Sequence, residues 1–148
     1  MTRPPFAKGG LNRAGSRRAG AAAVEFAIVL PVLVTILLGA TDFGRFSYSA
    51  IAVANAARAG AAFGSMNSSS SSYSTWQAGI ENAVTDELSN SSAFDAASVT
   101  VDVTTVTEGT GLTRVSVQVT YPFTTIVSWS YLPSSFNLQH TCVMRCLR

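Results

Sequence analysis

A chain of 148 residues is long enough for one modest domain with extra segments, but too short for two full domains. Charged residues make up 12% of the chain, about half the share usual in soluble proteins, and hydrophobic residues make up 47%. This composition argues against a wholly soluble protein and predicts a membrane segment.

The N-terminal 20 residues hold five basic residues and no acidic residue. Without them the net charge would change from +2 to −3, because five basic and eight acidic residues remain. Lys and Arg are enriched on the cytoplasmic side of membrane helices, so residues 1–20 are predicted to be a basic cytoplasmic leader. Nucleic-acid binding is disfavoured, because no aromatic or groove-reading element accompanies these charges.

An apolar run follows over residues 19–40, with Glu25 as its only charge. As a helix these 22 residues would span about 33 Å, enough to cross a hydrocarbon core of about 30 Å. A secretory signal peptide is the alternative, but its apolar core is usually about 7–15 residues long and ends at a small-x-small site. The run is longer, and no clear site of that kind precedes Asp42. The sequence therefore predicts a single-pass inner-membrane helix with its C-terminal side in the periplasm.

The helix is expected to continue beyond the membrane as an alanine-rich extension, giving one segment over residues 21–63. Asp42 and Arg45 are three residues apart and are predicted to pair where the chain leaves the bilayer. Gly64 and the serines after it are predicted to end the helix. Small side chains recur every three or four residues and would permit close packing against another helix, although alanine also simply favours helix. These residues are Ala50, Ala54, Ala57 and Ala61.

Glu25 is unusual, because burying a carboxylate in lipid costs free energy. An acidic residue inside a membrane segment is therefore expected to have a function. The alternative is that it reaches the interface or is protonated. Gly20 precedes it by five positions and follows a basic leader. This arrangement resembles the processing site of type IV prepilins, in which a membrane aspartyl peptidase would cut between Gly20 and Ala21. The resemblance implies that Glu25 neutralises the new amino terminus of a neighbouring subunit and so sets the assembly register.

The wider stretch over residues 17–62 resembles the TadE-like family of tight-adherence pilus-assembly proteins. The matching motifs are Val24–Ala27, Leu30-Pro31, Gly39–Arg45 and Ala57–Ala61. The position after the glutamate holds Phe26, where well-studied processed pseudopilins carry tyrosine.

The TadE-like resemblance implies a minor pilin-like component, or pseudopilin, of a type IV pilus assembly system, supporting pilus biogenesis, surface attachment and biofilm formation. The implied partners are a prepilin peptidase, other pilins or pseudopilins, inner-membrane assembly proteins and the lipid bilayer. The alternative is an unprocessed bitopic scaffold of the same machinery.

A serine-rich linker is predicted over residues 64–74, followed by a small exported domain over residues 75–148. Ser74 and Gln77 form a candidate capping box. Apolar residues then recur at steps of four and predict an amphipathic helix: Trp76, Ile80, Val84 and Leu88.

Alternating valines predict two strands, over residues 99–104 and 115–121, joined by a turn at residues 108–111. Residues 138–147 are compatible with a third strand. The predicted fold class is α+β, with a long N-terminal transmembrane helix and then one helix on a short antiparallel sheet. A core of this size is thin, so the N-terminal helix is expected to help cover it.

The apolar segment over residues 124–132 has two interpretations. It is either a loop that closes the core, which is favoured, or an exposed loop that docks on the membrane surface or a partner.

The C-terminal residues His140, Cys142 and Cys146 are the one cluster that invites a metal or thiol interpretation. On a strand all three would share a face, with the two cysteines about 13 Å apart, too far for a disulfide or for one metal ion. On a helix the cysteines would approach each other but His140 would turn away. Cross-linking between subunits and burial remain alternatives for the thiols. With a single histidine and no nucleophile in motif spacing, neither an enzyme, a metal nor a cofactor is predicted.

Overall fold

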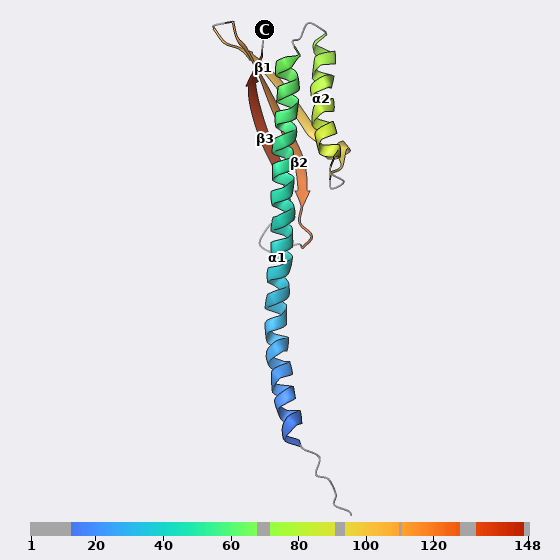
Figure 1. The fold of residues 1–148 in the computed structure, drawn as a ribbon, viewed down its shortest axis with the longest axis vertical. Coiled ribbons are helices and arrows are strands. Elements are labelled where there is room, and N and C mark those ends of the chain that lie inside the picture. The colour runs from blue at the N-terminus through green and yellow to red at the C-terminus, as the bar shows by residue number, and fades with distance from the viewer. Residues whose placement is uncertain (1–12, 68–71, 91–93, 110, 128–132, 147–148) are drawn as a thin grey trace, which may run out of the picture. The chain divides into compact units, whose positions relative to one another are not determined.

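The computed structural model describes residues 13–67, 72–90, 94–109, 111–127 and 133–146. The elements in chain order are α1 (Arg13–Met66), α2 (Tyr73–Ser89), the short 3-10 helix η1 (Ala96–Ser98), β1 (Thr100–Thr107), β2 (Thr113–Thr124) and β3 (Ser135–Arg145) (Figure 1). A long apolar helix, a second helix and an antiparallel sheet confirm the predicted α+β class. The chain divides into two compact units, Met1–Ala40 and Thr41–Arg148.

The first unit holds the apolar part of α1. Between Gly20 and Leu38 every side chain is exposed, including the large apolar ones. The helix from Gly20 to Met66 is long and apolar enough to cross a membrane. Pro31 lies inside it, where it removes one backbone donor, and the Thr35 hydroxyl donates to the Pro31 carbonyl at 2.8 Å.

The second unit contains a three-stranded antiparallel sheet in the order β1-β2-β3. Every second residue of β2 points to the core, as the valine alternation predicted: Val115, Val117, Val119 and Phe123 are buried. The third strand, expected over residues 138–147, extends from Ser135 to Arg145.

Helix α2 buries the four apolar residues that the spacing of four predicted, Trp76, Ile80, Val84 and Leu88. The predicted capping box is wrong. The helix already begins at Tyr73, because the Ser72 carbonyl accepts hydrogen bonds from the backbone N–H groups of Thr75 and Trp76. Ser74 therefore lies inside the helix, and the Gln77 amide donates to the Glu81 carboxylate at 3.2 Å.

Gly64 and the serines after it were predicted to end the helix, and in the structure α1 continues past Gly64 to Met66. Gly64 permits close packing there. A Cβ at this position would lie 2.8 Å from the Ile80 Cδ1 and 3.1 Å from the Val115 Cγ1. The indole N–H of Trp76 donates to the Gly64 carbonyl at 3.2 Å. Tertiary contact therefore overrides the local preference of glycine for a helix end.

The C-terminal part of α1 contributes to the core of the second unit, as expected for a small domain. Its buried residues are Val53, Ala56, Ala57 and Ala61. A Cβ at Gly60 would lie 2.6 Å from Val84 Cγ2 and 3.3 Å from Val117 Cγ1. This part of α1 therefore packs against both α2 and β2.

Candidate functional site

The predicted processing site lies on an exposed, helical part of α1. Gly20 and Ala21 are both exposed, and a Cβ added at Gly20 would meet nothing within 4 Å. The lack of a side chain at Gly20 is therefore not required by packing within the chain.

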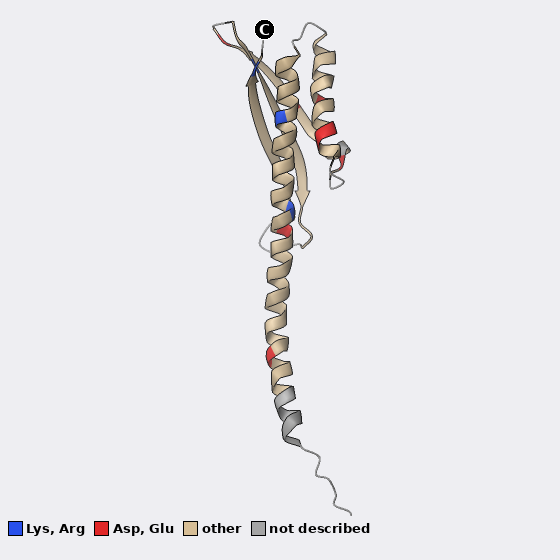
Figure 2. Ribbon diagram, viewed as in Figure 1, with Lys and Arg blue, Asp and Glu red and all other residues tan. Residues whose placement is uncertain are grey.

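Glu25 lies one helical turn beyond Ala21 and is exposed. It shares a shallow depression on the helix surface with Ala22, Phe26 and Val29. It is the only charged residue between positions 19 and 40, in the part of α1 that Figure 2 shows almost free of charged residues. Its surroundings are apolar, so an ionised carboxylate at this position in lipid would need a partner from another molecule or from the interface.

The structure places the alanine stripe at two levels of burial. Ala57 and Ala61 are fully buried in the core of the second unit. Ala50 and Ala54 are half-buried, and Ala50 packs against that core. The last two alanines of the stripe therefore already have a helix and a sheet of their own chain as neighbours.

Asp42 has a role that the sequence did not reveal. The predicted contact with Arg45 is present at 3.4 Å, between Arg45 Nη1 and Asp42 Oδ1. The Asp42 carboxylate is buried and also accepts two backbone N–H bonds, from Ile126 at 3.0 Å and from Val127 at 3.4 Å. It therefore fixes the start of the β2–β3 connection to α1. The partners lie 84 and 85 positions away, so no local motif could have identified them.

An aromatic cluster and Arg45 complete this corner of the second unit. The Phe46 ring lies 5.9 Å from the Phe123 ring and 5.6 Å from the Phe136 ring. The Arg45 guanidinium lies 5.5 Å from the centre of the Phe123 ring, and its Nη1 donates to the Thr124 carbonyl at 3.4 Å. The predicted Asp42–Arg45 pair is thus part of a tertiary contact between α1 and the ends of β2 and β3.

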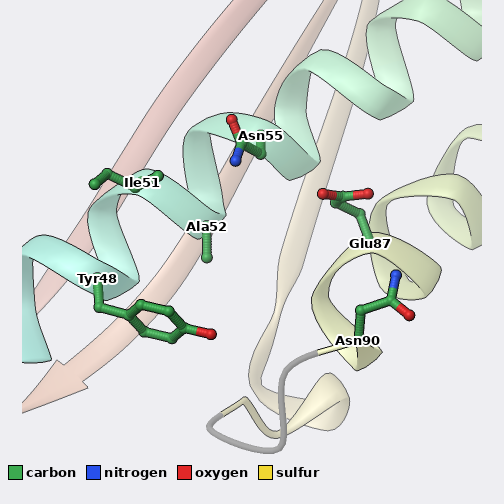
Figure 3. A pocket seen from close by; sticks show the side chains of 6 residues that line it. All are labelled: Tyr48, Ile51, Ala52, Asn55, Glu87 and Asn90. Atoms are coloured by element: carbon green, nitrogen blue, oxygen red, sulfur yellow. The ribbon is translucent and has the colours of Figure 1, made fainter.

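The second unit has a notch between α1 and the end of α2 (Figure 3). In Figure 3, α1 lines one side of the gap with Tyr48, Ile51, Ala52 and Asn55, and the end of α2 lines the other side with Glu87 and Asn90. One carboxylate, two amides and the Tyr48 hydroxyl offer hydrogen bonds in this notch.

His140 and Cys142 lie on β3, the strand that the sequence allowed, and Cys146 follows directly after its end. Cys142 pairs with Val117 and His140 with Val119, so both share the face of the buried valines. Cys142 and Cys146 are free and half-buried. Within the described ranges, no group of three His, Cys, Asp or Glu side chains could hold a metal ion. Trp129, Tyr131 and Leu132 of the predicted apolar loop lie outside the described residues.

Comparison with known proteins gives one family. Residues 20–62 match the family model described as TadE-like protein, which confirms the predicted resemblance over that part of the chain. The match covers less than a third of the chain. It begins at Gly20 and includes Glu25, Asp42 and the alanine stripe. No curated protein and no solved structure matches the chain. The match indicates a protein related to the tight-adherence pilus, with an N-terminal apolar helix.

Proposed function

From the match of residues 20–62 to the TadE-like family, we propose that this chain is a minor pilin-like component of a tight-adherence pilus assembly system. A prepilin peptidase removes residues 1–20, and the remaining chain is held in the inner membrane by α1 with its second unit in the periplasm. One observation carries the proposal: the family match begins at Gly20, and Glu25 follows on an exposed apolar helix.

Cleavage after Gly20 is supported by the surroundings of the peptide bond. Gly20 and Ala21 are exposed and carry at most a methyl group, so a peptidase at the membrane face meets little steric obstruction. The basic leader keeps this bond at the cytoplasmic side, because Lys and Arg resist transfer across the membrane.

Assembly next to other pilin-like subunits is supported by Glu25. Cleavage creates a positively charged amino terminus at Ala21, and lipid surroundings strengthen the attraction between opposite charges while making an unpaired charge costly. Glu25 of one subunit therefore pairs with the amino terminus of the next. Because that pairing is satisfied in one relative position of the two helices, it fixes their register.

Membrane anchoring is supported by the exposed apolar side chains of α1 before residue 40. In water such a surface would drive association, whereas lipid covers it without cost. The helix satisfies its own backbone hydrogen bonds, as a segment in lipid must.

The experiment that tests the proposal is the intact mass and N-terminal sequence of the protein purified from membranes of its native host. The wild-type chain is expected to begin at Ala21. A Gly20→Leu variant is expected to keep the leader, because leucine obstructs the peptidase. Gly44→Leu is the matched control: Gly44 is also exposed with nothing within 4 Å of an added Cβ, so this variant is expected to be processed normally.

A wild-type chain that begins at Met1 would overturn processing and leave the unprocessed bitopic scaffold as the function. A chain that begins beyond Ala40 would show that the apolar segment is a removed signal peptide, and it would overturn the anchor as well.

A further inference from the structure

The corner where the chain passes from the apolar segment into the second unit carries exposed apolar side chains. Phe43 is 69% exposed and Ile126 is 60% exposed, whereas Asp42, which precedes Phe43 and bonds the Ile126 N–H, is buried. We define the docking corner as Phe43, Arg45, Ile126 and Val127. In an exported domain with a polar outer sheet face, two large exposed apolar side chains at one corner are a candidate contact surface.

The structure holds this corner in place by specific bonds. The Asp42 carboxylate accepts the N–H groups of Ile126 and Val127, and Arg45 bonds the Thr124 carbonyl. The backbone N–H of Thr125 donates to the Ser134 carbonyl at 3.0 Å and closes the base of the connection. Ile126 is therefore fixed beside the first turn of α1 that belongs to the second unit.

Covalent continuity sets the distance of this corner from the bilayer. Asp42 follows Ala40 by two residues of the same helix, which corresponds to a rise of about 3 Å. If residues 20–40 cross the membrane, Asp42 lies at its surface whatever the orientation of the second unit. Ile126 and Val127, which are bonded to Asp42, are then held at the same level.

We propose that the docking corner inserts into the lipid headgroup region on the periplasmic side of the inner membrane. The inference rests on the membrane anchoring in the proposed function and goes beyond it. Phe43 and Ile126 enter the boundary between headgroups and acyl chains, where amphipathic surfaces bind. Arg45, whose side chain is 47% exposed, lies at the level of the lipid phosphates.

The acidic residue Asp42 at the docking corner is compatible with contact with lipid headgroups. Its side chain is 9% exposed, and its oxygens are directed to backbone N–H groups and to Arg45, so it presents little negative charge to anionic phosphates. The membrane-facing charge of the corner is therefore that of Arg45, which complements the headgroups.

The test is site-directed spin labelling of the full-length chain in vesicles of phosphatidylethanolamine and phosphatidylglycerol. Cys142→Ala and Cys146→Ala remove the native thiols, and circular dichroism checks that this background is folded. Single cysteines then replace Ile126, Val106 and Leu33 in separate variants. Each nitroxide is scored by its collisions with oxygen, which concentrates in lipid, and with a water-soluble nickel chelate.

The three positions make a matched set. Val106 is 60% exposed, as Ile126 is, and it lies on β1 at the opposite end of the sheet from Phe123 and Phe136. Leu33 is 53% exposed and lies in the middle of the predicted span. The ratio of oxygen to nickel collisions is expected to be lowest at residue 106 and highest at residue 33. At residue 126 it is expected to be at least three times the ratio at residue 106. A label at Phe43 repeats the measurement if the residue 126 variant fails to fold.

The outcomes separate the two proposals. Equal ratios at residues 126 and 106, with a lipid-like ratio at residue 33, would overturn docking and leave the anchor intact. A water-like ratio at residue 33 would overturn the anchor and docking together. Protection of residue 126 from both reagents would show burial against protein and would likewise overturn docking in lipid.

Discussion

Glu25 and Asp42 are both acidic residues of α1, but their surroundings indicate different roles, in assembly for Glu25 and in folding for Asp42. Asp42 is buried and satisfied by N–H donors of its own chain. Glu25 is exposed among apolar side chains. A buried carboxylate with hydrogen-bond donors from its own chain stabilises the fold. A carboxylate among apolar side chains needs a donor or a positive charge from another molecule. The two residues therefore give opposite expectations when their charge is removed.

Neutralising Glu25 is expected to affect assembly and leave the fold unchanged. In Glu25→Gln the side chain keeps its size but loses its charge, so the neighbouring amino terminus is left without a partner. Breaking a desolvated ion pair costs about 3–5 kcal/mol, which lowers the association constant between subunits by at least about a hundredfold. The measurement is the amount of the chain in sheared surface fibres relative to the membrane fraction of the native host. Leader removal serves as the control and should be unaltered; fibre incorporation equal to wild type would contradict the role of Glu25.

Removing the Asp42 carboxylate is expected to destabilise the second unit. Asp42→Ala leaves the N–H groups of Ile126 and Val127 without their acceptor, at a cost of about 1–3 kcal/mol. Thermal unfolding of the full-length protein in detergent measures the loss, and amide hydrogen exchange at Ile126 should accelerate. Asp102→Ala is the matched control, because Asp102 is an exposed acid on β1, and it is expected to shift stability by less than about 0.5 kcal/mol. Similar destabilisation by both changes would contradict the specific role of Asp42.

At the scale of elements, side-chain periodicity identified what each segment buries, but not where each helix begins and ends. The step of four in α2 and the alternation in β2 were sufficient to predict Ile80 and Val117 as core residues, because burial follows the period of the backbone. The start of α2 at Tyr73 and the continuation of α1 past Gly64 depend on backbone bonds and on contacts between elements distant in sequence. The partners of Asp42 escaped prediction for the same reason.

Gly60 tests the close packing of α1 on α2. In Gly60→Ala the added Cβ would lie 2.6 Å from Val84 Cγ2, so the core must shift, and a loss of about 1–3 kcal/mol in the free energy of unfolding is expected. Gly44→Ala is the control, since its Cβ meets nothing within 4 Å, and it should stabilise the helix by up to about 1 kcal/mol.

The double variant Gly60→Ala/Val84→Ala tests whether the destabilisation in Gly60→Ala comes from a clash with Val84. Truncating Val84 removes the clashing methyl group, so the double variant should be more stable than the sum of the two single losses predicts. Additive losses in chemical denaturation would show that the Gly60 site does not depend on contact with Val84.

At the scale of the whole molecule, the second compact unit begins at Thr41, within α1. Val53, Ala56, Ala57 and Ala61 of α1 belong to its core, and Gly60 and Gly64 bring the helix against Ile80 and Val115. One helix therefore serves in succession as an apolar segment long enough to cross a membrane and then as a core helix of the second unit. The recurring small residues of α1 are compatible with packing inside the second unit and equally with packing against another subunit.

This division predicts which fragments fold. A fragment of residues 41–148 keeps the whole core and is expected to be a folded domain without detergent. A fragment of residues 67–148 loses α1 and uncovers the inner faces of Ile80, Val84, Val115 and Val117. Each fully buried side chain of this kind contributes about 1.5–3 kcal/mol, so their exposure removes an amount comparable with the entire stability of a small domain, about 5–15 kcal/mol. The shorter fragment should show no cooperative thermal transition and should bind a hydrophobic dye. A cooperative transition at the same midpoint in both fragments would mean that α1 is dispensable for the fold, and that its alanines are free to pack against a neighbouring subunit.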